Sequence, residues 1–214
     1  MIHPDLHFEI EQWQTGKQFI AGIDEAGRGA WCGPVAAAAV ILPADEHILE
    51  NLKGVRDSKL MSAKQREVWA DKIREHALYW QVGLAGHEEI DAMGIVPATR
   101  LAMMRAIEGL QIQPDHLLID AVKLPKINIS QNSMVKGDQK SLSIAAASVL
   151  AKTSRDALLM DLAKTYPDYG FERHKGYGTR LHQTNLKKWG PCEIHRKSFA
   201  PIKLYFEEVP VEET

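Results

Sequence analysis

The sequence predicts an α/β fold built on a mixed β-sheet, and three observations support this prediction. Short apolar segments of strand length alternate along the chain with longer segments of helical periodicity. The first two apolar segments are joined by a glycine-rich stretch, residues 27–33, which favours an antiparallel hairpin. A length of 214 residues with 45% hydrophobic and 25% charged side chains fits one globular domain and excludes a disordered, collagen-like or coiled-coil chain.

Two strands are expected at the start of the fold. Residues 19–24 are mostly apolar, and the Gly-Arg-Gly tripeptide that soon follows ends a strand there. Residues 35–42 have the length of a second buried strand, although their four alanines leave a buried helix open as an alternative. Pro43 and the acidic pair after it end this segment.

A helix and a third strand come next. Ser62 and Gln65 have the spacing of a capping box, which predicts a helix from there to about Ala77. Beyond it, large apolar side chains alternate with other side chains over residues 80–85, as in a half-buried strand. The side chains expected on the buried face of the helix are Val68, Trp69 and Ile73.

The second half of the chain repeats this alternation, with further short helices expected beyond Tyr166 and Pro167. Two of its predicted strands end in an acid. The predicted elements are a helix that starts at Pro97 with Leu101, Met104 and Ile107 in the core, strands over residues 117–120 and 134–138, and a long helix over residues 141–164 that opens with small side chains.

The charges are distributed unevenly, although the formal net charge is only −2. Residues 136–203 contain 13 Lys and Arg against 6 Asp and Glu, whereas the residues before them are acidic on balance. This asymmetry favours a polyanion along one face, with an ordinary solvated surface as the alternative. The longest apolar run, residues 35–42, is too short to span a membrane, and no secretory signal pattern is present, so we expect a cytoplasmic protein.

Three predicted strands deliver carboxylates at their ends, namely Asp24 with Glu25, then Asp120, then Asp138. Each close pair of like charges costs roughly 4 kcal/mol at ~4 Å and an effective dielectric constant of about 20, so a cluster needs protons or a cation. An all-oxygen donor set favours Mg²⁺ or Mn²⁺ over zinc, and two such ions suit phosphodiester hydrolysis. For a single acid, a strand-end residue satisfied by backbone N–H groups is the alternative.

The Gly-Arg-Gly tripeptide, residues 27–29, follows the acid pair closely. Its glycines allow close approach of a ligand to the backbone, and Arg28 suits a phosphate. A dinucleotide-binding loop is excluded, because the third glycine of G-x-G-x-x-G falls on Cys32 and Gly33 stands one residue too late.

Residues 174–179 form a second candidate segment, with a histidine, a lysine, a tyrosine and two glycines. This composition suits sugar-phosphate contacts with stacking, and an ordinary basic loop is the alternative. The spacing of His174 and His182 matches no zinc pattern. Cys32 and Cys192 lack a C-x-x-C pair and a nucleophile setting, so we expect plain core or surface thiols.

In this order, the motifs resemble those of the type 2 ribonucleases H of bacteria, from Ala21 to Ile202. The most specific of them is Gly22-Ile23-Asp24-Glu25-Ala26-Gly27-Arg28-Gly29. The others are Gly33-Pro34-Val35, Asp57-Ser58-Lys59-Leu60, Leu118-Ile119-Asp120-Ala121, Lys136-Gly137-Asp138, Ile144-Ala145-Ala146-Ala147-Ser148, Ala151-Lys152, residues 174–182 and His195-Arg196-Lys197-Ser198-Phe199.

The resemblance implies roles for the residues that match these motifs. Four of them stand at the positions of the family's catalytic, metal-binding carboxylates, which implies Mg²⁺ or Mn²⁺, with two ions during catalysis; these are Asp24, Glu25, Asp120 and Asp138. The substrate-binding residues implied in the same way are Gly27, Arg28 and Gly29 for the ribose 2′-hydroxyl, Lys59 for a phosphate, and Tyr177 for the deoxyribose on the 3′ side of the ribonucleotide.

The resemblance also implies an RNase H-like fold, which is a mixed five-stranded sheet flanked by helices with a helical carboxy-terminal extension. We therefore expect a catalytic core over residues 1–165, and over residues 166–214 a helical extension that completes the substrate site and ends in a short acidic tail. Trp31 and Cys32 depart from the small or aliphatic residues usual in the family. The tail, residues 204–214, has no obvious sliding-clamp-binding motif, so contact with a clamp stays open.

These expectations combine into a metal-dependent endoribonuclease that hydrolyses the phosphodiester bond 5′ of a ribonucleotide, in RNA–DNA hybrids and in duplex DNA with single embedded ribonucleotides. Cleavage leaves 3′-hydroxyl and 5′-phosphate ends and serves ribonucleotide excision or primer removal. We expect a monomer that does not act at a membrane. Two alternatives stay open: a DNA nuclease or resolvase of the same fold without 2′-hydroxyl selectivity, and a catalytically silent nucleic-acid-binding module.

Overall fold

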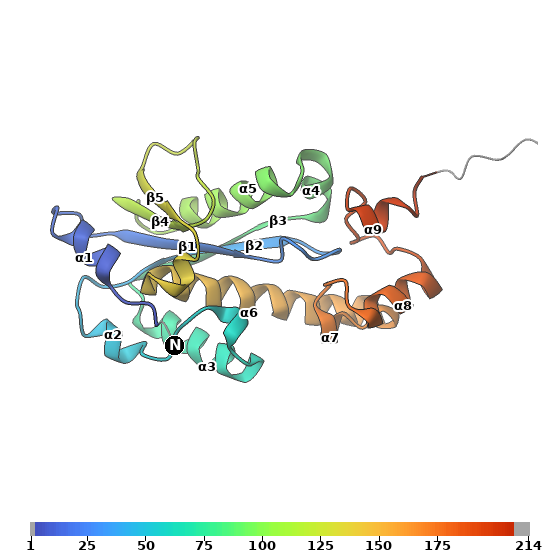
Figure 1. The fold of residues 1–214 in the computed structure, drawn as a ribbon, viewed down its shortest axis with the longest axis horizontal. Helices are drawn as coiled ribbons and strands as arrows, with labels where there is room; N and C mark the ends of the chain where they lie inside the picture. Colours follow the sequence, from blue (N-terminus) through green and yellow to red (C-terminus); the bar gives the residue numbers. More distant parts are fainter. Residues whose placement is uncertain (1–2, 208–214) are drawn as a thin grey trace, which may run out of the picture.

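A five-stranded sheet with the strand order β3-β2-β1-β4-β5 forms the centre of the protein (Figure 1). The structure is a computed structural model that describes residues 3–207. The strands are β1 (Ile20–Ala26), β2 (Val35–Ile41), β3 (Tyr79–Ala85), β4 (His116–Asp120) and β5 (Ser130–Met134). β2 pairs antiparallel with β1 and β3, whereas β4 pairs parallel with β1 and β5. The prediction of a mixed five-stranded sheet is confirmed.

Helices cover both faces of this sheet (Figure 1). On one face α5 (Ile95–Glu108) packs against β2 and β3, with α4 (His87–Met93) beside it. On the other face α6 (Leu142–Thr165) packs against β1 and β2, and α3 (Ala63–His76) packs against α6. The remaining elements are the helices α1 (His7–Trp13) and α2 (Ile48–Asn51) and the 3₁₀ turns η1 (Ser58–Leu60), η2 (Gly137–Gln139) and η3 (Pro167–Tyr169).

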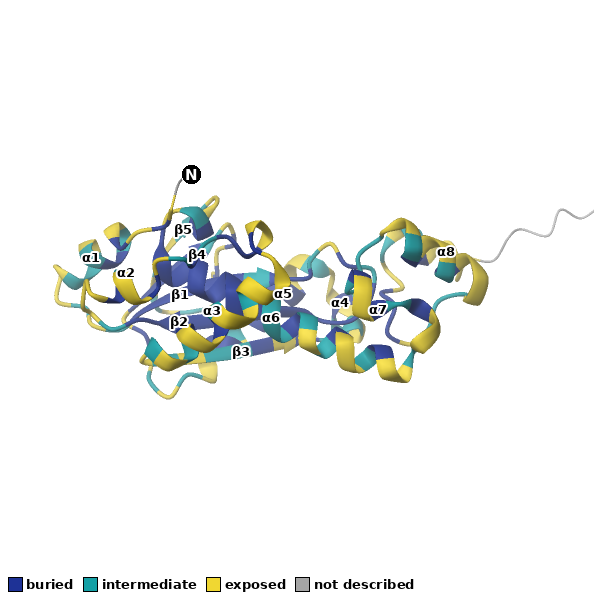
Figure 2. Cartoon of the chain, turned by 90° about the horizontal axis from the view of Figure 1, so that it is seen from below, coloured by how far each residue is buried: buried dark blue, intermediate teal, exposed yellow. Residues whose placement is uncertain are grey.

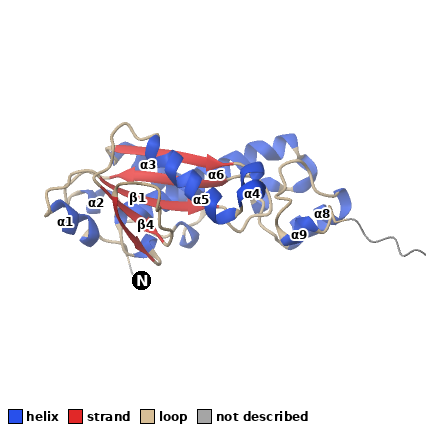
Figure 3. Ribbon diagram, turned by 90° about the horizontal axis from the view of Figure 1, so that it is seen from above, coloured by secondary structure: helices blue, strands red, loops and turns tan. Residues whose placement is uncertain are grey.

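Three short helices follow α6 in the chain, namely α7 (Phe171–His174), α8 (Arg180–Trp189) and α9 (Ala200–Lys203). They gather beyond one end of the sheet, on the side toward which α6 extends (Figures 1 and 3). Residues 208–214, which hold most of the predicted acidic tail, lie outside the described residues. Within residues 3–207, even the 24-residue α6 is not apolar enough to cross a membrane, and the other helices are shorter.

Strand β2 shows how a run of alanines becomes a strand in this fold. Its seven residues are all buried, and successive side chains alternate between the core beneath α5 and the core beneath α6. Figure 2 shows the sheet mostly in the colour of buried residues, with the exposed residues on the outer surfaces of the helices. The backbone of β2 pairs with a strand on each side, so tertiary pairing decides against the helical alternative.

One predicted strand is wrong. The strand in this region, β5, covers the polar residues Ser130–Met134 and not residues 134–138. Its pairing with β4 ends where Asp120 pairs with Met134. The chain then turns at Lys136, which has a left-handed backbone, and Asp138 lies in η2. The acid therefore follows the edge strand instead of ending it.

Two predicted buried faces need correction. On α3 the capping box of Ser62 and Gln65 is confirmed, but Val68 is 50% exposed and the buried side chains are those of Ala70 and Ile73. On α5 the sheet contacts small residues, so the expected stripe is rotated by about one position. Its buried residues are Ala98, Thr99, Ala102, Met103, Ala106 and Ile107, whereas Leu101 and Met104 are only partly buried.

Candidate active site

The four predicted carboxylates come from one edge of the sheet. Asp24 and Glu25 lie in β1, Asp120 is the last residue of β4, and Asp138 lies in η2 just beyond β5. These three strands are parallel neighbours, so their carboxyl ends point the same way. The sheet therefore brings together the acids from segments that lie far apart in the sequence.

Burial and mutual repulsion act on the two acids of β1. Burial, followed by the charges of Glu25 and Asp120, raises the pKa of Asp24 well above its ordinary value. Burial also raises the pKa of Glu25, and the hydrogen bond and charge of Arg28 oppose this increase. The backbone N–H of Glu25 donates to Asp24 Oδ1 at 2.7 Å. These shifts identify a site where negative charge accumulates with too few partners.

The acids at the other strand ends have different partners. Asp120 Oδ1 accepts a hydrogen bond of 2.7 Å from the backbone N–H of Gly137, which fixes its orientation. Burial, the charges of Asp57 and Asp120, and a hydrogen bond with the Asp57 side chain raise the pKa of Asp138 to about 6. Asp57 is therefore a fifth carboxylate at the site. Sequence reasoning did not select it, although it belongs to one of the motifs that carry the resemblance.

Lys59 brings a positive charge to the same cluster. Its Nζ lies 3.9 Å from Asp138 Oδ2, and its side chain is 73% exposed. Burial by itself lowers the pKa of Lys59, but the charges of four carboxylates outweigh it and raise the pKa. The ammonium is therefore charged, anchored at the acids and open to solvent, as a phosphate contact requires.

Two buried oxygens test whether the acids fit a metal. Within the described residues, Asp24 Oδ2 and Glu25 Oε2 are buried from water and have no hydrogen-bond partner. An orphaned carboxylate oxygen is costly, and a cation beside it removes that cost. Because every donor in the cluster is a carboxylate oxygen, the site fits hard divalent ions such as Mg²⁺ or Mn²⁺.

The predicted Gly-Arg-Gly segment forms the loop directly after β1. Arg28 Nη1 donates to Glu25 Oε1 at 3.1 Å, while 40% of the arginine side chain stays exposed. Gly27 has a φ of +94°, and a Cβ at this position would lie 2.0 Å from Nε of Arg155. A Cβ at Gly29 would meet nothing within 4 Å. Gly27 is thus required by the protein's own packing, whereas Gly29 faces open space.

Two buried arginines, which sequence reasoning did not single out as site residues, hold this loop in place. Arg155 of α6 donates to the carbonyl oxygens of Cys32, Pro34 and Lys175, at 2.9 to 3.1 Å. Arg196 donates to the carbonyl oxygens of Gly33 and Arg28 at 2.9 and 3.0 Å. Neither arginine gives a local signal of such a role, because the partners of both are backbone atoms of distant segments.

Tyr177 lies next to the same loop. Ala30 and Tyr177 form an antiparallel bridge, and the backbone N–H of Trp31 donates to the carbonyl oxygen of Gly176 at 2.8 Å. The Tyr177 ring is partly exposed, and the cationic groups of Lys152 and Arg155 lie 5.1 and 5.5 Å from its centre. The structure therefore brings Tyr177 beside the Gly-Arg-Gly loop, from which it is separated by about 150 residues in the sequence.

Comparison with known proteins connects this geometry with a family. The ribonuclease HII family profile matches residues 21–202. The chain is 50% identical over 198 residues to a ribonuclease HII of Desulfitobacterium hafniense, a match that covers 92% of this chain and 75% of the relative. It is 49% identical over 200 residues to the ribonuclease HII of Chloroflexus aurantiacus, with 93% of this chain and 94% of the relative covered.

Solved structures share the fold. The RNase HII of Archaeoglobus fulgidus, solved in a complex with PCNA, superposes with a TM-score of 0.73 at 28% identity and covers 85% of this chain and 95% of that one. Bst-RNase HIII, solved in complex with Mn²⁺, superposes with a TM-score of 0.65 at 18% identity and covers 91% of this chain and 71% of that one. At 18% identity the likeness concerns the fold alone. The predicted RNase H-like fold is confirmed.

Proposed function

Because this chain belongs to the ribonuclease HII family and is an endoribonuclease of the ribonuclease H type, we propose that it cleaves the phosphodiester bond on the 5′ side of a ribonucleotide. The substrates are RNA–DNA hybrids and duplex DNA with single embedded ribonucleotides, and the products carry 3′-hydroxyl and 5′-phosphate ends. This activity serves ribonucleotide excision and primer removal.

One observation supports the proposal most directly. The carboxylates that collect at the end of β1, β4 and β5 lie beside a loop whose Gly29 faces open space. Hydrolysis and recognition of the sugar can therefore take place at adjacent groups. A catalytically silent binding module is disfavoured, because negative charge beside phosphates weakens binding unless a cation neutralises it.

Asp24, Glu25, Asp120 and Asp138 are the residues that would hold Mg²⁺ or Mn²⁺, with two ions present during catalysis. The Mn²⁺ complex of Bst-RNase HIII supports a divalent ion for this fold. The chemistry that such ions supply when bound is activation of water and stabilisation of the leaving oxygen.

The chain's own residues prepare the substrate for in-line attack by water. The Gly137 N–H holds Asp120 in one orientation, and Lys59 presents an exposed ammonium for a backbone phosphate. Arg28, partly exposed and anchored on Glu25, supplies a second cation near the scissile group. Gly27 and Gly29 let the backbone approach the ribose closely, so that its 2′-hydroxyl is read by backbone groups.

Tyr177 completes the selection of the RNA-to-DNA junction in this proposal. Its partly exposed ring would pack on the deoxyribose that follows the ribonucleotide, where a 2′-hydroxyl would be crowded. We also propose a cytoplasmic monomer whose segment beyond residue 166 completes the substrate site. The Archaeoglobus fulgidus complex with PCNA makes a sliding clamp a partner to test, although the tail carries no recognisable motif for one.

The test uses an end-labelled DNA duplex with one internal ribonucleotide, incubated with the protein and Mg²⁺ or Mn²⁺. We expect a single cut on the 5′ side of the ribonucleotide. Asp120→Asn should reduce cleavage by at least about 1,000-fold while hybrid binding stays near the wild-type level, because a neutral amide of nearly the same shape replaces a charged carboxylate ligand.

Asp161→Asn, a change at an exposed acid of α6, is the matched control and should cleave like the wild type. An all-DNA duplex should stay intact. Cleavage of both duplexes would favour a DNA nuclease or resolvase without 2′-hydroxyl selectivity. Binding without cleavage in either metal would favour the binding module, and full activity of Asp120→Asn would refute the assigned site.

A further inference from the structure

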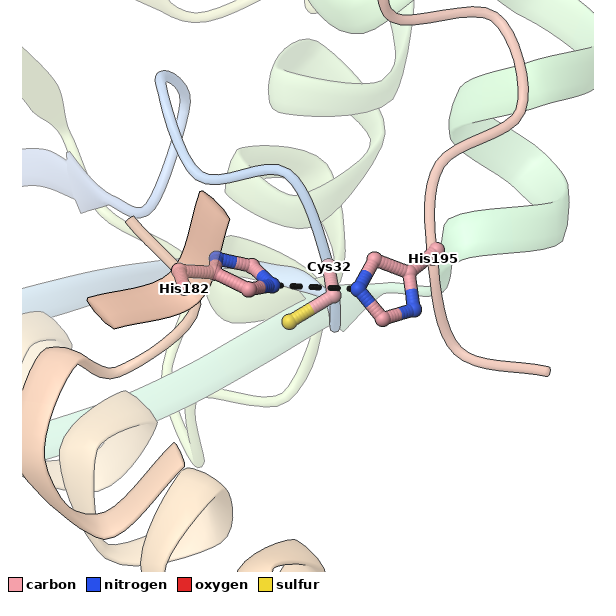
Figure 4. A group of neighbouring side chains, drawn as sticks. All are labelled: Cys32, His182 and His195. Atoms are coloured by element: carbon pink, nitrogen blue, oxygen red, sulfur yellow. Dashed lines mark hydrogen bonds between the residues drawn. The ribbon is translucent and has the colours of Figure 1, made fainter. Parts of the chain in front are cut away.

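Cys32, His182 and His195 form a compact buried group where three segments of the chain meet (Figure 4). Cys32 lies in the loop between β1 and β2, His182 in α8, and His195 in the segment before α9. The sulfur atom and one ring nitrogen of each histidine all lie within 4.8 Å of one another. The group shares no residue with the carboxylate site.

The His182 and His195 rings point their Nε2 atoms toward each other. The Nε2 atoms of His182 and His195 are 3.0 Å apart, and in Figure 4 the sulfur of Cys32 lies beside the line that joins them. The pKa values of both histidines are lowered to about 4, mainly by burial, so both rings are neutral at physiological pH. Neutral imidazoles have the lone pair that binding to a metal requires.

The outer nitrogens of both rings each lie next to a backbone carbonyl oxygen. Nδ1 of His182 lies 3.1 Å from the carbonyl oxygen of Tyr177. Nδ1 of His195 accepts a hydrogen bond of 2.9 Å from the backbone N–H of Cys192 and lies 3.2 Å from the carbonyl oxygen of the same residue. A histidine that binds a metal through one nitrogen usually donates its other N–H to a carbonyl or carboxylate. Both Nε2 atoms are thus directed inward. Metal binding would preserve the outer contact of His182, whereas His195 would exchange the bond from the Cys192 N–H for a bond to the Cys192 carbonyl oxygen.

We propose that Cys32 Sγ and the Nε2 atoms of His182 and His195 bind a thiophilic d¹⁰ cation, Zn²⁺ or Cu⁺. One thiolate and two imidazoles suit these soft or borderline ions and disfavour Mg²⁺, which prefers oxygen. At metal–nitrogen bonds of about 2.0 Å, two tetrahedral ligand nitrogens lie roughly 3.3 Å apart, so the rings need to separate only slightly.

The proton balance of binding is simple. Burial raises the pKa of Cys32 to about 12, so the free protein holds a thiol there. Because Nδ1 of His195 accepts from the Cys192 N–H, the proton of this ring lies on Nε2 and is donated to Nε2 of His182 in the free protein. On binding, the thiol proton leaves to solvent, and the Nε2 proton of His195 moves to Nδ1, which then donates to the Cys192 carbonyl instead of accepting from the Cys192 N–H. One proton is therefore released for each cation bound.

Two buried arginines near Cys32 affect Zn²⁺ and Cu⁺ differently, so the experiment tests both cations. The charges of Arg155 and Arg196 act on Cys32 and favour its thiolate, which assists binding. The same charges repel a cation, and they oppose a dication more than a monocation. Occupation of the site would tie the loop after β1 to α8 and to the segment before α9, and would hold Tyr177 through His182.

The experiment uses the reduced, chelator-treated full-length protein with Co²⁺ as the spectroscopic probe for Zn²⁺. Excess Mg²⁺ is present to occupy the carboxylates. We expect a thiolate-to-cobalt charge-transfer band in the near ultraviolet that saturates at one equivalent and disappears when Zn²⁺ is added. An all-carboxylate site contains no sulfur and gives no such band. In a second arm, Cu⁺ is titrated without oxygen against a chromophoric chelator.

Cys32→Ala should lose the cobalt band and the single high-affinity Cu⁺ equivalent. Cys192→Ala is the matched control, because Cys192 is the other cysteine of the chain and its Sγ is not one of the proposed ligand atoms. Its Sγ lies 3.1 Å from Nδ1 of His195, on the outer side of the ring, and the backbone N–H and carbonyl of residue 192 remain in the variant, so both signals should be kept. His182→Gln should also lose them, which keeps the test valid if Cys32→Ala folds poorly by circular dichroism. The thermal unfolding midpoint of the wild type should rise with the bound cation.

Binding of Cu⁺ alone would assign the site to the monovalent ion. The proposal is overturned if the wild type binds neither probe, or if the signals depend on Cys192 and not on Cys32.

Discussion

Gly27 and Gly29 stand two residues apart in one tripeptide, but the protein packs tightly around Gly27 and leaves Gly29 free. A side chain at Gly27 would collide with Arg155 and would strain a backbone with φ of +94°, whereas a side chain at Gly29 would meet open space. A pair of alanine substitutions therefore distinguishes a glycine required by the fold from a glycine kept free for a substrate.

We expect Gly27→Ala to lower the free energy of unfolding by about 2 kcal/mol, through the strained backbone and the collision. Gly29→Ala should leave stability within about 0.5 kcal/mol of the wild type and still lower kcat/KM on the single-ribonucleotide duplex by about tenfold or more. Urea unfolding and steady-state cleavage measure the two effects. Wild-type kcat/KM in Gly29→Ala would remove that residue from the substrate contact.

His116, at the start of β4, gives the protein a pH-dependent stability. It is only 4% exposed, and burial followed by the charge of Lys17 lowers its pKa from 6.5 to about 4. Between these two values the unfolded chain binds a proton that the folded protein excludes. The stability that His116 contributes is therefore complete above about pH 6.5 and is lost as the pH falls toward 4.

The two pKa values predict a loss of about 2 kcal/mol between pH 7.5 and pH 5 from this residue alone. His116→Gln removes the titrating group and should reduce the pH dependence of unfolding by that amount. Denaturant unfolding of both proteins at the two pH values measures the difference. Identical pH slopes would show that His116 is not excluded from protonation in the folded state.

At the scale of elements, the long helix α6 approaches β1 closely enough to exclude a side chain. A Cβ at Gly22 would lie 2.1 Å from the backbone carbonyl carbon of Ser143 and 2.4 Å from the backbone nitrogen of Ile144. The first ten residues of α6, Leu142–Ala151, are all buried, and most are small. The small-residue opening seen in the sequence is thus the helix side of a contact whose strand side is Gly22.

Gly22→Ala should destabilise the protein by about 3 kcal/mol or more, because two backbones, and not a flexible side chain, would have to separate. The thermal unfolding midpoint of this variant, compared with that of Gly29→Ala, measures the effect. A wild-type midpoint would show that α6 can move away from β1 without loss.

At the scale of the whole molecule, the positive charge is concentrated in the second half of the chain. Residues 136–203 carry the excess of Lys and Arg, and they include α6, which packs under the sheet, and α7 to α9, which gather beyond its end (Figure 1). Backbone phosphates bound by such side chains release counterions, which makes affinity fall as salt rises.

We therefore expect the Kd of the Asp120→Asn protein for an RNA–DNA hybrid to rise at least about tenfold between 50 and 200 mM salt. Fluorescence anisotropy with a labelled hybrid at several salt concentrations provides the slope. An affinity independent of salt would place the hybrid contacts on uncharged groups and would contradict the inference drawn from the charge distribution.

Patterns within single segments were sufficient for much of the fold. Short apolar runs predicted three strands, period-two alternation predicted β3, and a capping box predicted the helix α3, because these signals depend on neighbours within a few residues. The short helices α1, α2 and α4 had no predicted counterpart, and the polar edge strand β5 was displaced toward Asp138. Such elements are formed by contacts with the rest of the molecule, which a local pattern does not contain.

The sequence by itself determined which carboxylates, glycines and aromatic residues are candidates for chemistry, since a residue's type is a local property. Only the tertiary structure decided that Asp57 joins the acids, that Arg155 and Arg196 hold the Gly-Arg-Gly loop, and that Cys32 meets two histidines. These groups join residues separated by up to 168 positions, and the pairing of β-strands and the packing of α6 bring them together. Folding, and not spacing along the chain, therefore creates both sites.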